Sequence, residues 1–341
     1  MNGRTISQEQ NTRQLITKLT ALWAVSESGL GGFFHAVKLP FSGLILGSFA
    51  VIIVTFIALN SEKKFRTIIN ATLLVILIKA IASPHSPFTA YIAVAFQGFV
   101  GALIYAFAKP NYFSAVLYGI IALLESAFQK LLMLTVVFGE NIWTAFSQFF
   151  QNLAQQFSFQ AIENFPVAAV GIYAGAYFIA GIAAGFYGLT LPGKISSEAE
   201  KLKTADILPS GFSPDRKKKN RKLSGLIFTG AILLFIVTVF LLSGSVPKAL
   251  QAILRTAAAI LIIFAVVNPL FKYLIARWKT SAQSRKQNEL NAVLHFVPEF
   301  RKNVNTAWNY AAAENGWLRK INRFLIVWLA LSLYLNENHH D

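Results

Sequence analysis

The chain has 341 residues, among which there is no cysteine, only two methionines and few charged side chains. Without cysteine there can be no disulfide, no thiol nucleophile and no thiolate metal site. Charged residues make up 13% of the chain, whereas soluble domains carry about 25%. The sequence also contains no P-loop, no HExxH motif and no nucleophile elbow. We therefore expect neither an enzyme of these classes nor a bound metal or cofactor.

Apolar side chains are what the sequence has in excess. They make up 55% of the residues, and the mean hydropathy is +0.52. A soluble chain of this length could not bury so much apolar surface in its core. The composition therefore predicts an all-α membrane protein with about eight transmembrane helices.

The apolar runs place these helices. A span needs about 20 apolar residues, and proline-containing or charged stretches separate the runs. The expected spans are residues 15–35, 41–60, 65–82, 88–108, 112–138, 165–191, 223–242 and 249–275. Residues 141–160 and 279–322 have the spacing of amphipathic helices that lie at an interface or in the cytoplasm. The last apolar run, 324–335, is too short to span, so we expect it to be interfacial or packed on the bundle.

The net charge of +16 is unevenly distributed, since 21 of the 31 Lys and Arg residues follow residue 190. Positive loops stay on the cytoplasmic side, so we expect a cytoplasmic N-terminus and a multi-pass protein of the inner (cytoplasmic) membrane. The same charge could attract nucleic acid, but in a membrane chain we interpret it as positive-inside loops. We expect a six-span bundle at 1–190, a basic cytoplasmic linker at 191–222, and a two-span hairpin with amphipathic coupling or anchor helices at 223–341.

Polar residues inside the spans are the candidate binding site, because ionisable groups in the membrane are expensive and usually functional. They are Glu27, His35, Lys79, Gln97, Glu125, Gln129 and Lys130, with His85 in the loop after the third span. One interpretation pairs Glu27 or Glu125 with Lys79 or Lys130 as structural ion pairs, or lets the lysines snorkel to the surface. Another is an outward-facing pocket for a small anionic solute. A third makes Glu27 or Glu125 a proton-relay carboxylate.

The first half also resembles a known family. The stretch 21–24 (Ala-Leu-Trp-Ala), the glycines at 29, 31 and 32, and the Lys-Leu-Pro-Phe-Ser-Gly stretch at 38–43 resemble the opening of the substrate-binding (S) component of energy-coupling-factor transporters. The resemblance implies six spans, a site for a vitamin-like solute near the outer helix ends, and ATPase and coupling subunits as partners. It also implies that Ala21 and Ala24 are coupling contacts.

The C-terminal region is similar to the coupling (T) subunit of the same systems. The similarity rests on 295–300 (His-Phe-Val-Pro-Glu-Phe) and 311–316 (Ala-Ala-Ala-Glu-Asn-Gly). Glu314 stands where the family has the arginine that docks into the ATPase, and Arg277, in Ala-Arg-Trp, is a partial match. The resemblance implies partner contacts at both positions. The alternative is a basic amphipathic anchor on anionic lipid.

Together these patterns predict a transport protein that is the solute-binding or coupling component of a small-solute uptake system. A proton-coupled secondary carrier and a non-transport membrane scaffold are the alternatives. The expected partners are the lipid bilayer, separate ATPase and coupling subunits, and a small anionic or vitamin-like solute.

Overall fold

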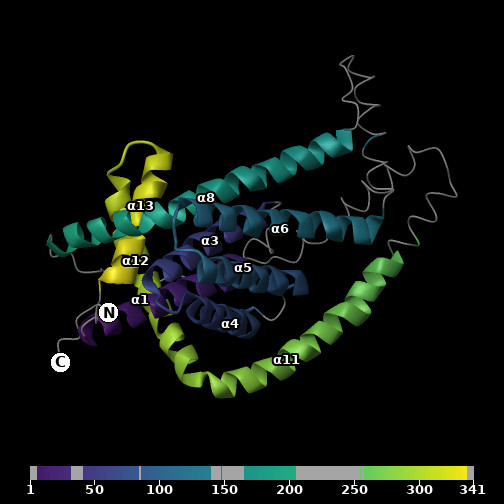
Figure 1. The fold of residues 1–341 in the computed structure, drawn as a ribbon, viewed down its shortest axis with the longest axis horizontal. Coiled ribbons are helices and arrows are strands. Elements are labelled where there is room, and N and C mark those ends of the chain that lie inside the picture. Colours follow the sequence, from purple (N-terminus) through teal and green to yellow (C-terminus); the bar gives the residue numbers. More distant parts are fainter. Residues whose placement is uncertain are drawn as a thin grey trace, which may run out of the picture. The chain divides into compact units, whose positions relative to one another are not determined.

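The computed structural model describes residues 6–31, 41–83, 86–139, 147, 165–204, 254 and 257–335. These residues are helical apart from short turns, and no strand occurs among them (Figure 1). The elements are α1 (Ile6–Val25), the π-helical turn η1 (Ser26–Leu30), α3 (Ser42–Asn60), α4 (Lys64–Ala82), α5 (Phe88–Phe107), α6 (Tyr112–Phe138), α8 (Phe165–Thr204), η2 (Ile263–Val267), α11 (Asn268–Arg285), α12 (Gln287–Ala312) and α13 (Trp317–Tyr334). The all-helical class is confirmed.

Six helices in the described ranges are long and apolar enough to cross a membrane. They are Ser42–Asn60, Lys64–Ala82, Phe88–Phe107, Tyr112–Val136, Val167–Thr204 and Ala257–Arg285. The predicted count of about eight is not confirmed. The predicted span 15–35 falls on α1 and η1, which are not long and apolar enough to be counted among the six. The predicted span 223–242 lies outside the described residues. The amphipathic segment expected at 141–160 also lies outside them, apart from residue 147.

Local sequence explains where the helices of the bundle begin and end. Helix α5 ends at Phe107, and Lys109 and Pro110 follow its C-cap residue Ala108. Proline disfavours helix in the residue before it, so the helix does not continue. Asn111 then caps α6: its side-chain Oδ1 accepts a 2.9 Å bond from the Ser114 N–H, while the Ser114 hydroxyl accepts a 3.0 Å bond from the Asn111 N–H. This reciprocal arrangement satisfies backbone donors that have no partner within the helix.

Helix α1 lies in the middle of its neighbours. Every residue from 18 to 24 is buried, so the helix is covered on all sides rather than on one face. It contacts α3, α4, α12 and α13. At Val25 the helix passes directly into η1. Such π-turns are rare and occur frequently at functional sites.

Glycines set the approach of α6 and α8. A Cβ atom added to Gly181 would lie 2.7 Å from the backbone oxygen of Gly119, and one added to Gly185 would lie 2.4 Å from that of Ala115. The two helices thus pack backbone against backbone, as small residues permit in membranes. The second small-residue pair of α8, Gly171 and Gly175, has no atom within 4 Å of the added Cβ positions.

Helix α8 is longer than predicted. It continues through Pro192 to Thr204, whereas we expected the span to end at residue 191 and a linker to follow. The added turns bury Ile195, Ala199 and Leu202. This apolar face outweighs the single hydrogen bond that proline removes. The rest of the predicted linker, 205–222, lies outside the described residues.

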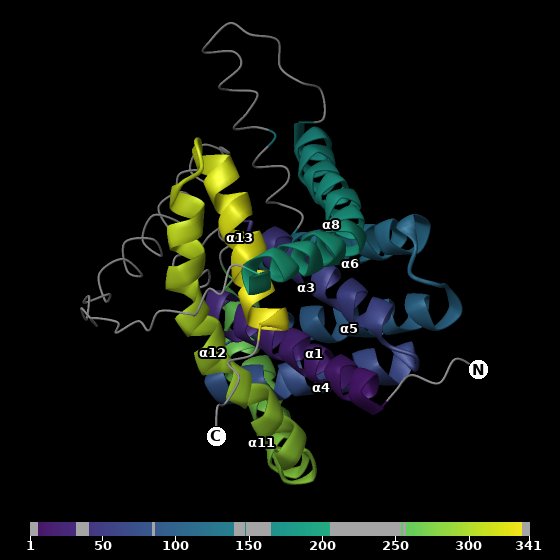
Figure 2. The ribbon, with the colours of Figure 1, turned by 90° about the vertical axis from the view of Figure 1, so that its left-hand side faces the viewer.

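Helices α12 and α13 form an antiparallel hairpin that contacts α1 (Figures 1 and 2). Pro298 lies inside α12 but does not divide it. A series of rings joins the pair: Trp308 packs edge-on against Phe324, Phe324 stacks on Trp328, and the Trp328 Nε1–H donates a 2.8 Å bond to the Phe300 backbone oxygen. The short apolar run near the C-terminus is therefore packed in α13, as expected.

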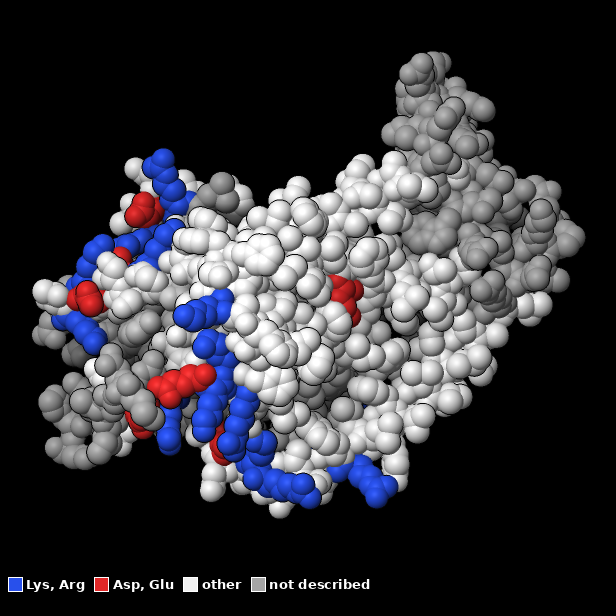
Figure 3. Space-filling view, viewed as in Figure 1, with Lys and Arg blue, Asp and Glu red and all other residues white. Residues whose placement is uncertain are grey.

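Contacts between residues divide the chain into two compact units. The first comprises residues 1–126, 177–213 and 273–341, and the second comprises 127–176 and 214–272. The site described below lies in the first unit. On the face drawn in Figure 3, the Lys and Arg side chains of this unit gather toward α12 and α13 and the C-terminal end of α11, while the surface of α5 and α6 is almost free of charge.

Candidate functional site

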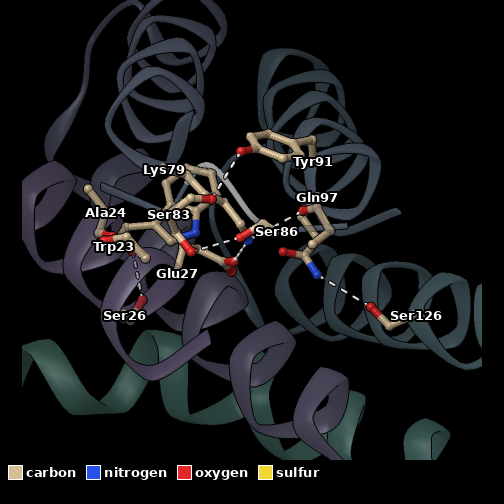
Figure 4. Close-up of polar contacts among 12 residues, drawn as sticks. Trp23, Ala24, Ser26, Glu27, Lys79, Ser83, Ser86, Tyr91, Gln97 and Ser126 are labelled. Carbon is tan, nitrogen blue, oxygen red and sulfur yellow. Dashed lines mark hydrogen bonds and ion pairs between the residues drawn. The ribbon is translucent and has the colours of Figure 1, made fainter. Parts of the chain in front are cut away.

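A buried ion pair joins η1 to α4. The Lys79 Nζ lies 2.7 Å from Glu27 Oε2, and the two side chains are only 3% and 4% exposed (Figure 4). Lys79 lies in the last turn of α4, where the helix dipole favours a cation. Glu27 is presented by the π-turn. The geometry selects one of the pairings that the sequence left open, namely Glu27 with Lys79.

Helix α5 completes the surroundings of the lysine. The backbone oxygen of Ala90 lies 3.5 Å from Lys79 Nζ, and the Tyr91 ring lies beneath the ammonium with its centroid 6.0 Å away. The Tyr91 hydroxyl donates to the Ser83 backbone oxygen over 3.4 Å. An ammonium over an aromatic face is stabilised by the ring quadrupole. Lys79, on α4, is thus held by η1 and α5 and has little freedom to reach the membrane surface.

Unpaired polar atoms accompany the ion pair. Gln97, which is 3% exposed, donates through Nε2 to the Ser126 hydroxyl over 3.4 Å, but its Oε1 has no hydrogen-bond partner among the described residues. The Trp23 Nε1–H is fully buried and likewise lacks a partner there. Buried polar groups without partners are rare and expensive. Trp23 and Gln97 therefore offer one free donor and one free acceptor that a solute or water can satisfy.

Glu125 is the third side chain of this kind. It is half-buried on α6, one residue before Ser126, and its Oε2 has no partner among the described residues. Gln129 and Lys130 follow on the next turn of the same helix, but they belong to the second unit, so nothing places them beside the ion pair. The two histidines of the predicted site, His35 and His85, lie outside the described residues.

The ion pair favours the structural interpretation of Lys79 over that of a cation presented to an anionic solute. Glu27 compensates the Lys79 charge at 2.7 Å. The described part of the site is therefore neutral overall and rich in hydrogen-bonding groups. Three hollows bordered by described residues lie around the N-terminal half of α1 and on α12, away from the pair.

Two of the predicted partner contacts are covered by this chain itself. Ala21 is 0% exposed and Ala24 is 1% exposed. A separate subunit could touch them only if the neighbouring helices moved aside. Arg277 is exposed on α11, and Glu314 is half-exposed in the turn between α12 and α13.

Sequence reasoning missed Ser126 and the unpaired state of Trp23. Serine is common in membrane helices and carries no signal of its own, so only the position of Gln97 on the neighbouring helix reveals its role. Among the described residues no group of three His, Cys, Asp or Glu could hold a metal ion. Comparison of the chain with protein-family models, with curated proteins and with solved structures finds no match.

Proposed function

We propose that this chain is an integral membrane transport protein whose N-terminal helices bind a small polar solute. The observation that carries the proposal is the Glu27–Lys79 ion pair, buried beside an unpaired indole donor on Trp23 and an unpaired amide acceptor on Gln97. Ionisable residues inside membrane bundles are expensive, so a solute that uses them gives a reason for their presence.

The chemistry of these groups suggests how a solute would be held. The Trp23 Nε1–H would donate to an oxygen of the solute, and Gln97 Oε1 would accept a bond from its N–H or O–H. A solute carboxylate would compete with Glu27 for Lys79, because both are anions within reach of one ammonium. A small molecule with a carboxylate and further polar groups, as a vitamin-like solute has, fits this set.

We further propose the role that the family resemblance implies. The chain would be a solute-binding or coupling component in the inner membrane, with a cytoplasmic N-terminus. Separate ATPase and coupling subunits would then supply the energy. The hairpin of α12 and α13, which packs on α1, is the part of the described chain that could pass a movement of such a partner to the site.

Purification of the full chain in mild detergent, followed by mass spectrometry of small molecules and co-purified proteins, tests the proposal. We expect a retained solute that is lost in Gln97→Leu, a variant that removes the free acceptor and keeps the side chain of similar size. Thr190→Val on α8 is the control, because the Thr190 hydroxyl donates to the Phe186 backbone oxygen within its own helix. A wild-type protein without bound solute, from cells grown on limiting vitamins, would contradict a solute site.

The unpaired Glu125 Oε2 favours a second candidate function, that of a proton-coupled carrier. A carboxyl group in an apolar helix bundle can take up and release a proton as the protein changes state. This candidate predicts uptake that collapses when the proton gradient is discharged, with no ATPase needed. Glu125→Gln should then abolish uptake while the protein still folds, whereas ATP depletion alone should have no effect.

A further inference from the structure

A groove beside the middle of α1 is separate from the Glu27–Lys79 pair. It is a hollow of about 440 Å³ between α1, α4 and α12, which we call the α1–α4–α12 groove. The lining residues that matter here are Arg13 and Ile16 from α1, Thr67 and Leu74 from α4, and Glu289 and Val293 from α12.

The groove is polar at one end and apolar at the other. Helices α1 and α4 run side by side in the same direction, because Glu27 meets Lys79 near their C-terminal ends while Arg13 and Thr67 border the groove near their N-terminal ends. From Thr67 to Leu74 the helix rises about 10 Å. Charged and hydroxyl groups therefore lie at the mouth, and Leu74 lies about two turns deeper.

The mouth of the groove lies at the N-terminal end of a candidate membrane span. Helix α4 is one of the six helices apolar enough to span, and the exposed residues Glu62 and Lys63 precede it. Its first turns carry Thr67, and its apolar body begins beyond them. A ligand in the groove would thus have its polar part in the headgroup region and its apolar part at acyl-chain depth.

The charges at the mouth are not balanced. The Glu289 carboxylate accepts a 2.7 Å bond from Asn70 and a 3.1 Å bond from Lys286, which also contacts Asn70. Glu289 is therefore compensated by Lys286. No described residue provides a hydrogen-bond or ion-pair partner for the Arg13 guanidinium, which stays available at the mouth.

We propose that the α1–α4–α12 groove binds an anionic phospholipid. Its phosphate lies at Arg13, and one acyl chain lies along Ile16, Leu74 and Val293. A guanidinium pairs with a phosphate through two parallel hydrogen bonds, and basic pockets between membrane helices bind anionic headgroups. The apolar end selects a lipid over a free anion. Because α12 forms one wall, the lipid also joins the C-terminal hairpin to the membrane bundle.

Native mass spectrometry of the delipidated full chain, titrated with phosphatidylglycerol or with phosphatidylcholine, tests this proposal. We expect phosphatidylglycerol to bind more tightly, and Arg13→Gln to weaken its binding about fivefold. Arg66→Gln is the matched control, because Arg66 is an exposed arginine near the start of α4 that does not line the groove. It should leave the affinity unchanged.

A second variant probes the apolar end. Ile16→Trp fills the space beside Leu74 and should reduce binding of phosphatidylglycerol without changing the charge at the mouth. Equal binding of the two lipids, or equal losses in Arg13→Gln and Arg66→Gln, would overturn the proposal. A third result would also overturn it: millimolar inorganic phosphate displaces phosphatidylglycerol, and Ile16→Trp binds the lipid normally. That result would assign the groove to a soluble anion.

Discussion

Glu27 and Lys79 hold each other across two helices at 2.7 Å, and neither side chain is more than 4% exposed. Each charge compensates the other, because a single unpaired charge buried in this environment would cost much free energy. The pair therefore fixes the position of η1 against the last turn of α4. It also leaves the site neutral until a solute or a proton disturbs it.

Removing one partner of this pair should destabilise the protein strongly. We expect Lys79→Met to lower the free energy of unfolding by about 3–5 kcal/mol, because it leaves the Glu27 carboxylate buried and uncompensated. The double variant Glu27→Gln, Lys79→Met removes both charges and should lose much less. Thermal unfolding in detergent, followed by circular dichroism, measures both. Equal losses in the single and double variants would show that the two side chains do not interact.

The double variant also separates folding from function. If the pair serves folding alone, a double variant that folds should still retain the co-purified solute. If Lys79 holds a solute carboxylate, the double variant folds and loses the solute. Mass spectrometry of the purified double variant decides between these outcomes.

The close contact between α6 and α8 gives a prediction with an internal control. Gly119→Ala places a Cβ atom 2.2 Å from the Gly181 backbone oxygen, so the helices must separate. We expect a loss of about 1–3 kcal/mol in stability. Gly171→Ala, on α8 but with no atom within 4 Å of the new Cβ, should be neutral or slightly stabilising. Comparison of their melting temperatures is the measurement, and a neutral Gly119→Ala would contradict the packing.

The spans 41–60, 65–82, 88–108 and 112–138 could be predicted to within about a residue because each is an apolar run bounded by polar or proline-containing stretches. The extension of α8 could not. Residues 192–204 are polar enough to suggest a loop, and they are helical because Ile195, Ala199 and Leu202 find apolar neighbours elsewhere in the chain.

The candidate site could also be predicted only in part. Glu27 and Lys79 were visible in the sequence, because a charge within an apolar run is conspicuous. Their pairing was one of several options, since a sequence does not give the rotation of one helix against another. Ala21 and Ala24 are buried on α1, and the helices that contact α1 include α12, which is more than 260 residues away along the chain. No local pattern carries that information.

A second ion pair fastens α13 to α8. Arg323 Nη2 lies 2.8 Å from Glu198 Oε1, and the Glu198 side chain is only 6% exposed. Arg323→Ala should cost about 2 kcal/mol, less than a fully buried pair because the arginine is 33% exposed and Lys201 stays 3.8 Å from the carboxylate. Limited proteolysis should show α13 released at a lower temperature. Arg319→Ala, an exposed arginine on α13, is the control and should behave as wild type.

Contact between α12 and α4 should depend on pH through Glu289. Partial burial alone would raise the pKa of Glu289, but the hydrogen bonds from Asn70 and Lys286 and the charge of Lys286 outweigh it and lower the pKa below 4.5. A carboxyl group whose pKa is lowered in the folded state releases its proton more readily there than in the unfolded chain. It therefore stabilises the fold above pH 4.5, and this contribution disappears as the pH falls through the folded-state pKa.

The variant Glu289→Gln isolates that contribution from the other titrating groups. The stability difference between wild type and Glu289→Gln should be constant from pH 7 to about pH 5 and should shrink below pH 4.5. Melting temperatures of both proteins over this range measure it. A difference that grows on acidification would mean that Glu289 carries a proton in the folded state, and the bond from Asn70 to its carboxylate would then not hold α12 against α4.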